Sequence, residues 1–164
     1  MKRVAVTGVG AVTPLGLDVD STWKAVLAGQ SGIGWISAFD ASGFPVRVAG
    51  EVKGFEPTSV ASAKDARKLE RNVLFALAAA REALTGSGLH GFDPHRVGIV
   101  FGSAIGGIAG VVEQADVMRE RGADRVSPNF LPNTLVDTAS GQLAISLGIK
   151  GPNYAVVSAC ATGS

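Results

Sequence analysis

Apolar residues follow two alternating patterns along the chain: short runs rich in β-branched residues, and longer stretches with helical spacing. The runs Val4–Thr13, Arg96–Phe101 and Tyr154–Ala159 predict buried strands, and each is followed by a turn of glycine, proline or small residues. A minor strand is predicted over Val46–Val52, inside the otherwise loop-like stretch Gly32–Pro57.

Helical spacing of apolar residues predicts helices between these runs. The first helix begins at Asp20 or Ser21 and stops at Gly29. The clearest one stops at Gly86-Ser-Gly88. Its apolar positions are Leu69, Val73, Ala76, Leu77, Ala80 and Leu84, and those of the first helix are Trp23, Val26 and Leu27.

Two more helices are predicted near the C-terminal side of the chain. One follows Gly107, and the other follows the rigid connection Ser127–Pro132 and stops at Gly148. Gly141 within the latter helix predicts close packing against a neighbouring element. Strands that alternate with helices indicate an α/β layered fold with a largely parallel sheet, and the apolar strands predict a sheet that is covered on both faces.

Composition and charge narrow the class of protein. The chain of 164 residues is 46% apolar and 18% charged, which excludes disorder over most of its length. The net charge of +1 argues against a nucleic-acid or anionic-membrane surface. One cysteine cannot form an internal disulfide, and no apolar run reaches the length of a membrane span or a signal-peptide core, so we expect a cytoplasmic protein.

Among the 22 glycines of the chain, two clusters resemble phosphate-binding loops, but only weakly. Gly8-Val-Gly10-Ala-Val-Thr13 lacks the third glycine of a dinucleotide fingerprint, and Gly102–Gly107 lacks the lysine of a phosphate loop. We interpret both as turns in which helices pack closely on strands, and we predict no cofactor. His90 and His95 lie in a polar loop without a nearby cysteine, which predicts surface residues and no metal site.

Cys160 stands where the last predicted strand gives way to Ala-Thr-Gly-Ser. Small residues at a strand-to-helix turn are typical of a nucleophile elbow, which exposes its side chain at the top of a sheet. The N–H groups of a following helix would lower the thiol pKa and donate to an oxyanion. The alternative is a small buried hydrophobic residue, which composition alone favours.

Four basic residues precede and enter the clearest helix: Lys64, Arg67, Lys68 and Arg71. Their spacing predicts a single basic stripe on a helical surface. The stripe is either a docking site for an acidic partner or a solvated face that Asp65 and Glu70 balance.

A series of motifs over essentially all 164 residues resembles the β-ketoacyl-acyl-carrier-protein synthases of type II fatty acid synthesis, in particular the elongating synthase II subgroup. The motifs stand in that family's order and spacing. They are Val6-Thr-Gly-Val-Gly10, Thr13-Pro-Leu-Gly16, Ser21-Thr-Trp-Lys24, Ala28-Gly-Gln-Ser-Gly-Ile33, Phe39-Asp40, Lys64-Asp-Ala-Arg-Lys68, Gly102-Ser-Ala-Ile-Gly-Gly107, Ser127-Pro with Phe130 and Pro132, Gly151-Pro152, and Ala159-Cys-Ala-Thr-Gly163.

The resemblance implies a thiolase-like αβαβα fold of two similar halves, of which residues 1–164 form the first. It implies that Cys160 accepts an acyl group from acyl carrier protein and that condensation with malonyl-carrier protein follows, with loss of carbon dioxide. Ile105 and Phe130 match residues of the acyl pocket. The basic residues that match carrier docking are Lys64, Arg67 and Lys68, extended by Arg125.

The same resemblance implies a homodimer. It also places two catalytic histidines, a lysine and a glycine-rich phenylalanine loop in the second half, so residues 1–164 alone are expected to be inactive in condensation.

Four other classes remain open on the sequence. A thiolase would act on coenzyme A esters without decarboxylation, and the docking residues favour the synthase instead. Modular polyketide ketosynthases usually have two serines after the cysteine, whereas Cys160-Ala-Thr-Gly favours the fatty-acid type and leaves iterative polyketide synthases possible. A chain-length-factor-like partner normally lacks the cysteine. An NAD-binding domain is the most distant alternative.

Overall fold

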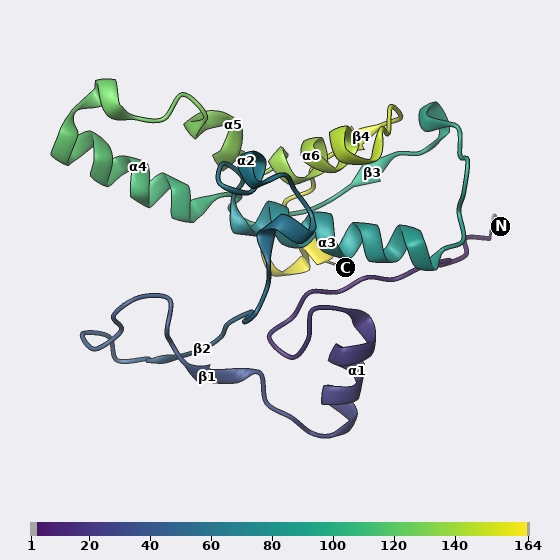
Figure 1. The fold of residues 1–164 in the computed structure, drawn as a ribbon, viewed down its shortest axis with the longest axis horizontal. Helices are drawn as coiled ribbons and strands as arrows, with labels where there is room; N and C mark the ends of the chain where they lie inside the picture. The colour runs from purple at the N-terminus through teal and green to yellow at the C-terminus, as the bar shows by residue number, and fades with distance from the viewer. Residues whose placement is uncertain (1–2, 164) are drawn as a thin grey trace. The chain divides into compact units, whose positions relative to one another are not determined.

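The computed structural model describes residues 3–163, which divide into two compact units (Figure 1). One unit contains the chain up to residue 56 together with residues 78–88, and the other contains residues 57–77 and everything from residue 89 onward. The helix α3, Arg71–Gly86, belongs to the second unit up to residue 77 and to the first from residue 78.

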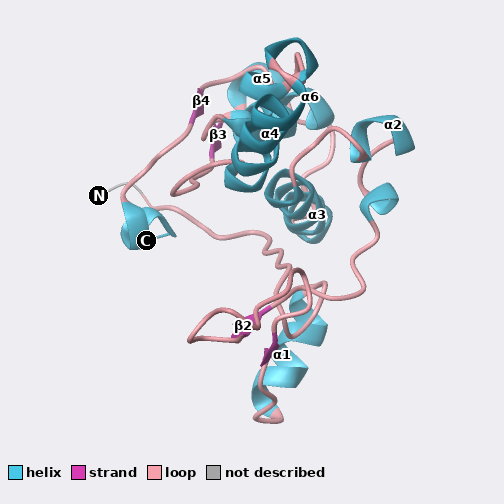
Figure 2. Cartoon of the chain, turned by 90° about the vertical axis from the view of Figure 1, so that its left-hand side faces the viewer, coloured by secondary structure: helices cyan, strands magenta, loops and turns pink. Residues whose placement is uncertain are grey.

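Within the described residues, the α-helices and strands alternate irregularly, and the strands are short (Figure 2). In chain order the elements are α1 Val19–Leu27, β1 Ile33–Trp35, β2 Val48–Gly50, α2 Ala63–Ala66, α3 Arg71–Gly86, β3 Ile99–Val100, α4 Ile108–Arg121, α5 Phe130–Thr134, α6 Thr138–Leu147 and β4 Asn153–Tyr154. Single 3-10 turns cover Pro57–Ser59, Pro94–Arg96, Ala123–Arg125 and Ala159–Gly163. None of the helices in this part of the chain is long and apolar enough to cross a membrane.

The predicted main helix is confirmed as α3, and it supplies more of the buried apolar residues than any other described element. Val73, Leu74, Ala76 and Leu77 are all buried, because apolar residues three and four positions apart fall on one helical face. In the second unit, Ala139 and Leu143 of α6 are buried as well.

The N-terminal segment packs against α3 through its glycines. A Cβ atom at Gly8 would overlap the carbonyl oxygen of Ala83, and one at Gly10 would overlap that of Ala79. This confirms that the first glycine cluster serves close packing on a helix. The prediction of a buried strand over Val4–Thr13 is wrong, since the strand-like pairing of this segment within residues 3–163 is limited to one isolated bridge between Thr13 and Gly16.

The exposure of this segment explains why no strand forms. Val4 is 95% exposed and Val6 is 83% exposed. A β-branched run is stabilised as a strand only when a neighbouring strand pairs with its backbone and its side chains are covered. Among residues 3–163, no neighbour does so here.

Helix α1 begins earlier than predicted. Asp18 caps it by accepting the backbone N–H of Ser21 at 2.6 Å, whereas the sequence pointed to Asp20 or Ser21 as the cap. Trp23, Val26 and Leu27 lie within this helix at the predicted spacing, but they are exposed, and Ala25 is its buried residue. Gly29 ends the helix at a positive φ of 64°, as predicted.

The predicted minor strand is confirmed as β2, which pairs antiparallel with β1. Strand β1 lies in a stretch that the sequence assigned to loop. Glu51 holds the turn after β1, since its carboxylate accepts the backbone N–H groups of Ser37 and Ala38 at 3.0 and 2.9 Å and the Ser37 hydroxyl at 2.6 Å. These bonds lower the pKa of Glu51, with the Ser37 side chain as the largest cause.

The parallel pairing expected of an α/β fold occurs between β3 and β4. Ile99 faces Asn153 and Val100 faces Tyr154. Helices α4, α5 and α6 lie between the two strands in the sequence, as a parallel crossover requires, and α6 packs beside both (Figure 1). The strands are shorter than the predicted runs Arg96–Phe101 and Tyr154–Ala159.

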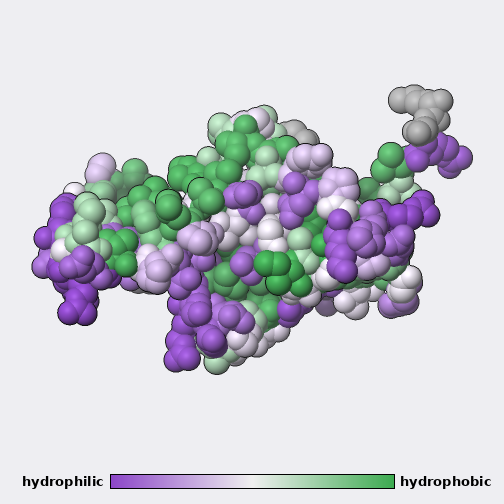
Figure 3. Space-filling model, turned by 90° about the horizontal axis from the view of Figure 1, so that it is seen from above, coloured by the Kyte–Doolittle hydropathy of each residue, from purple (hydrophilic) through white to green (hydrophobic). Residues whose placement is uncertain are grey.

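The predicted burial of the sheet on both faces is wrong for the described residues. Val100 and Tyr154 are 68% and 63% exposed. Apolar side chains also lie on the surface shown in Figure 3, beside charged ones.

Helix α6 ends at Gly148 in the left-handed conformation, with a φ of 68°, as predicted. The close packing predicted at Gly141 is absent, since a Cβ there would meet no atom within 4 Å apart from the neighbouring backbone of its own helix. The helix is tied to β4 instead by Asn153, whose amide donates to the Ser140 carbonyl at 3.1 Å.

Candidate active site

Parallel pairing brings two sequence motifs to the same edge of the small sheet. Strand β3 leads into Gly102–Gly107, and β4 leads through four residues into the 3-10 turn Ala159–Gly163 that carries Cys160. Because the strands run parallel, both connections leave from the carboxyl ends of their strands, where ligands of α/β sheets bind.

The turn that carries Cys160 has an unusual backbone. Ala159 adopts a φ of 50° and is the sole non-glycine residue with positive φ in the described chain. Cys160 itself is exposed, so the small buried hydrophobic residue that composition favoured is excluded by the geometry. A strained residue beside an exposed nucleophile is what a nucleophile elbow requires, although here the strain lies one residue before the cysteine.

Two hydrogen bonds close this turn around Ala159 and Cys160. Ser158 donates its backbone N–H to the Thr162 hydroxyl at 2.8 Å, and its carbonyl accepts the N–H of Ala161 at 3.1 Å. The sequence predicted a helix N-terminus at the sulfur, whereas the described residues form a 3-10 turn.

The glycine-rich loop lies directly against this turn. A Cβ at Gly102 would overlap the Thr162 methyl group and would stand 2.8 Å from the carbonyl oxygen of Val156. A hollow of about 530 Å³ is lined by these three residues together with Val100, Phe101, Ser103 and Ala104. The second glycine cluster therefore serves close packing, as predicted, and it packs beside the candidate nucleophile.

The two candidate acyl-pocket residues come from neighbouring elements. Ile105 is 63% exposed in the glycine-rich loop, and Phe130 is half-buried at the start of α5. The loop is joined to the end of α5, because Gly107 donates its N–H to the Thr134 carbonyl at 3.2 Å. Phe130 lines a different hollow from the one beside Thr162, and Ile105 lines neither of these two.

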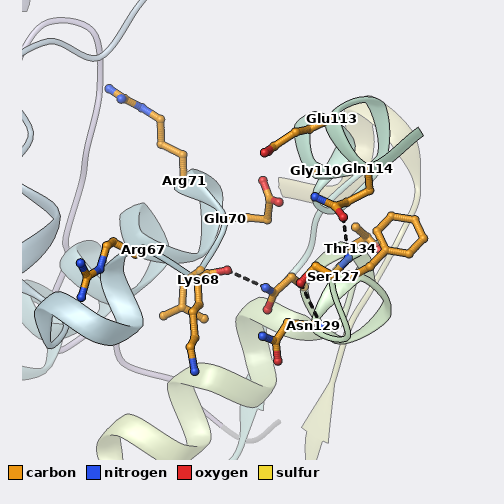
Figure 4. Close-up of a pocket in the computed structure, with 13 residues that line it drawn as sticks. Arg67, Lys68, Glu70, Arg71, Gly110, Glu113, Gln114, Ser127, Asn129 and Thr134 are labelled. Carbon is orange, nitrogen blue, oxygen red and sulfur yellow. Dashed lines mark hydrogen bonds between the residues drawn. The ribbon is translucent and has the colours of Figure 1, made fainter. Parts of the chain in front are cut away.

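The single basic stripe predicted from spacing does not form. Helix α2 ends at Ala66 and α3 begins at Arg71, so the chain turns within the motif. Arg67, Lys68 and Arg71 nevertheless line one hollow of about 310 Å³ (Figure 4). Lys64 lies on α2 and Arg125 in the 3-10 turn after α4, both exposed and both outside that lining.

Two carboxylates face each other in the same hollow. Figure 4 shows Glu70 and Glu113 turned toward one another, while Arg67 and Lys68 point away from them. Burial raises the pKa of Glu70, the charge of Glu113 raises it further, and a hydrogen bond from the Gly110 N–H partly offsets both. Glu70 thus does not simply balance the basic residues, as one interpretation of the sequence held.

Sequence reasoning missed two residues whose hydrogen bonds tie the site segments together, Thr162 and Asn133. Thr162 could have been identified from the sequence, since it stands two positions after the cysteine in a turn of small residues. Asn133, whose amide donates to the Lys68 carbonyl at 2.5 Å, could not, because its partner is far away in the sequence. His90 and His95 are exposed, as predicted, and no cluster of metal-ligating side chains occurs among residues 3–163.

These features define an α/β fold with a cysteine-bearing turn at the carboxyl edge of a parallel strand pair. The family described as "Beta-ketoacyl synthase, N-terminal domain" matches residues 1–164, and the chain belongs to this family. The resemblance found in the sequence and the expected thiolase-like α/β fold are both confirmed.

Curated relatives carry the name "3-oxoacyl-[acyl-carrier-protein] synthase 2". The Vibrio cholerae protein is 44% identical over 164 residues, and the Coxiella burnetii protein is 42% identical over 164 residues. Each match covers 99% of this chain and 40% of the relative. The chain therefore spans about two fifths of the length of these condensing enzymes.

Solved structures of ketosynthases share the fold. The ishigamide ketosynthase/chain length factor superposes with a TM-score of 0.86 at 26% identity, over 98% of this chain and 41% of that one. A beta-ketoacyl synthase from Burkholderia phymatum gives 0.78 at 28% identity, over 99% and 41%. A type II polyketide ketosynthase in complex with its acyl-carrier protein gives 0.75 at 24% identity, over 92% and 41%.

Proposed function

We propose that the protein containing this chain extends an acyl chain by two carbons in a decarboxylating condensation with malonyl-acyl carrier protein. The names of the relatives support the reaction, and the exposed Cys160 at the carboxyl edge of β3 and β4 is the observation that carries it. Cys160 is the sole thiol in the 164 residues, so it is the candidate nucleophile.

In the first step, the Cys160 sulfur attacks the thioester carbonyl of the acyl-carrier protein. A bond from Sγ to the carbonyl carbon forms, the bond from that carbon to the carrier's sulfur breaks, and the proton of Cys160 leaves with the carrier thiol. A thiolate suits this exchange because it is both a good nucleophile and a good leaving group.

In the second step, malonyl-carrier protein loses carbon dioxide, and the carbanion that remains attacks the acyl-enzyme carbonyl. The new carbon–carbon bond replaces the bond to Cys160, whose sulfur leaves as thiolate and regains a proton. The histidines within these 164 residues lie exposed in one loop, and we propose that decarboxylation depends on groups beyond residue 164. Residues 1–164, the N-terminal half in this proposal, would then be inactive in condensation.

Binding roles follow from the same proposal. Ile105 and Phe130 would contact the acyl chain, and Lys64, Arg67, Lys68 and Arg125 would dock the acidic carrier protein. Exposure of all four basic side chains supports docking, since local charge complementarity steers association even at a net charge near zero. We further propose a homodimer in the cytoplasm, as the resemblance implies.

A second candidate is the ketosynthase of an iterative polyketide synthase. The superposition on the ishigamide ketosynthase/chain length factor supports it. The higher identity to relatives named "3-oxoacyl-[acyl-carrier-protein] synthase 2" favours the first candidate. Chain-length analysis separates them, because one condensation per reduced acyl chain indicates fatty acid synthesis and repeated unreduced condensation indicates a polyketide.

The decisive experiment incubates the full-length protein with a saturated acyl-carrier protein and locates the acyl group by peptide mass mapping. We expect acylation on the peptide that contains Cys160 and none in the Cys160→Ser variant. Addition of malonyl-carrier protein should then release a β-ketoacyl product. Acylation at another residue, or an unlabelled Cys160 peptide in the unaltered protein, would refute the assignment.

A further inference from the structure

We infer that Thr162 is the positioning residue that fixes Cys160 for attack, and that Gly102 holds Thr162 in place from the opposite side. The inference rests on the proposed function of Cys160 as nucleophile. It assigns the positioning of Cys160 to contacts made by Thr162 and Gly102.

The first contact is the hydrogen bond inside the turn. The Thr162 hydroxyl accepts the Ser158 N–H at 2.8 Å, across the three residues Ala159, Cys160 and Ala161. Ser158 therefore has both of its backbone groups bonded within the turn, one to Thr162 and one to Ala161. Such pairing leaves the intervening backbone little freedom to rotate.

The hydrogen bond between the Ser158 N–H and the Thr162 hydroxyl, called the clamp below, opposes strain in the backbone. Ala159 has a φ of 50°, a conformation that is unfavourable for residues with a Cβ. Strained residues persist only where surrounding contacts hold them. Loss of the Thr162 hydroxyl would allow residue 159 to relax, and the adjacent Cys160 would move with it.

The second contact fixes Thr162 itself. Its methyl group faces Gly102, where a Cβ would overlap it, so only glycine lets the loop after β3 approach this closely. The hydroxyl and the methyl thus have separate tasks: the hydroxyl bonds the turn, and the methyl packs on the loop. A serine would keep the first and lose the second.

The experiment compares Thr162→Val with Thr162→Ser in the full-length protein. We expect the valine variant, which keeps the shape and loses the acceptor, to acylate Cys160 about tenfold more slowly at saturating acyl-carrier protein, since one hydrogen bond is lost. The serine variant should stay within about threefold of the unaltered protein because it keeps the acceptor. The KM for the carrier should change in neither.

Alkylation of Cys160 by iodoacetamide is the control for a purely structural effect. This small reagent needs an accessible thiol and no aligned carbonyl, so its rate should be similar in all variants. Slow acylation together with normal alkylation supports positioning. Equal acylation in the valine variant, or an equally slow serine variant, overturns the role of the hydroxyl.

Gly102→Ala tests the opposite side of Thr162. Its Cβ would displace the Thr162 methyl, so we expect slow acylation, and Thr162→Ser in the same protein should restore part of the rate by removing that methyl. The restoration is partial because the Cβ also stands 2.8 Å from the Val156 carbonyl. An unchanged rate in Gly102→Ala, or no recovery in the double variant, contradicts the packing role.

Amide hydrogen exchange tests the clamp without any substrate. The Ser158 amide should exchange about tenfold faster in Thr162→Val than in the unaltered protein or in Thr162→Ser. If the unaltered protein is not acylated at Cys160, the proposed function fails, and this exchange measurement still decides whether the clamp exists. Identical exchange in all three proteins would disprove it.

Discussion

Glu82 of α3 caps the first turn of α1, since one of its carboxylate oxygens accepts the backbone N–H of Val19 at 2.8 Å. The other oxygen accepts the N–H of Ala11 at 2.9 Å. One side chain thus accepts hydrogen bonds from a helix terminus and from an irregular segment. Neither N–H group has an acceptor within the backbone hydrogen-bond pattern of its own segment.

Glu82→Ala should lower the stability of the fold. Two partly buried N–H groups lose their acceptor, which costs about 1–3 kcal/mol. Thermal unfolding measures the effect, and Glu82→Gln should fall in between because its amide oxygen can replace one bond. Ala substitution of the exposed Glu120 in α4 serves as the control. A loss no greater than that of this control would show that the cap contributes nothing.

Gly10→Ala should destabilise the protein by about 1–3 kcal/mol, since overpacking forces the backbone apart. The added Cβ would overlap the Ala79 carbonyl. Gly86→Ala, at the end of α3, is the matched control, because a Cβ there meets nothing within 4 Å, and we expect a gain of up to about 1 kcal/mol from helix propensity. Similar melting temperatures for both variants would contradict the close approach.

Glu70→Gln should make stability less sensitive to pH. Because the pKa of Glu70 is raised in the folded protein, the folded state binds more protons than the unfolded state above the ordinary carboxyl range, and stability falls as pH rises through this window. The glutamine variant lacks this loss. Its melting temperature should match that of the unaltered protein near pH 4 and exceed it near pH 7.

Glu113→Gln provides the companion measurement. It removes the second cause of the raised pKa and leaves burial of Glu70 in place, so it should recover part of the same gain. A melting-temperature difference for Glu70→Gln that does not vary with pH would argue against an uncompensated charge at this position.

Charge reversal at Arg67 and Lys68 tests carrier docking. The double change to glutamate should weaken binding of acyl-carrier protein about tenfold or more at low salt, and the difference should shrink as salt screens the charges. Lys150→Glu, an equally exposed change outside the hollow, is the control. If the double variant and the unaltered protein bind acyl-carrier protein equally well at low salt, these residues form only a solvated surface.

The sequence predicts helices better than strands in this chain. The pattern of α3 identified its buried face, because helical periodicity is local and four turns of it are present. The strand over Val4–Thr13 failed for the opposite reason: strand formation depends on a partner that the segment itself does not encode. The same dependence shortened the strands at Ile99 and Asn153.

In the candidate site, too, some features could be predicted from the sequence and others could not. Cys160 was predictable because a lone thiol among small residues after an apolar run is a local signal. The proximity of Glu70 to Glu113 was not, since Glu70 precedes α3 and Glu113 lies on α4, and the path of the chain between them, through β3, depends on the fold. The basic stripe failed because spacing assumed one helix where the chain turns after Ala66.

The left-handed backbone at Ala159 limits which amino acids evolution or design can place there. Glycine, asparagine and aspartate tolerate this conformation, whereas valine, isoleucine and threonine resist it. Saturation mutagenesis should therefore produce a list of accepted residues ordered by backbone tolerance and unrelated to hydrophobicity. Alanine at this position would then be a compromise between a conformation that glycine suits best and the rigidity that glycine would sacrifice.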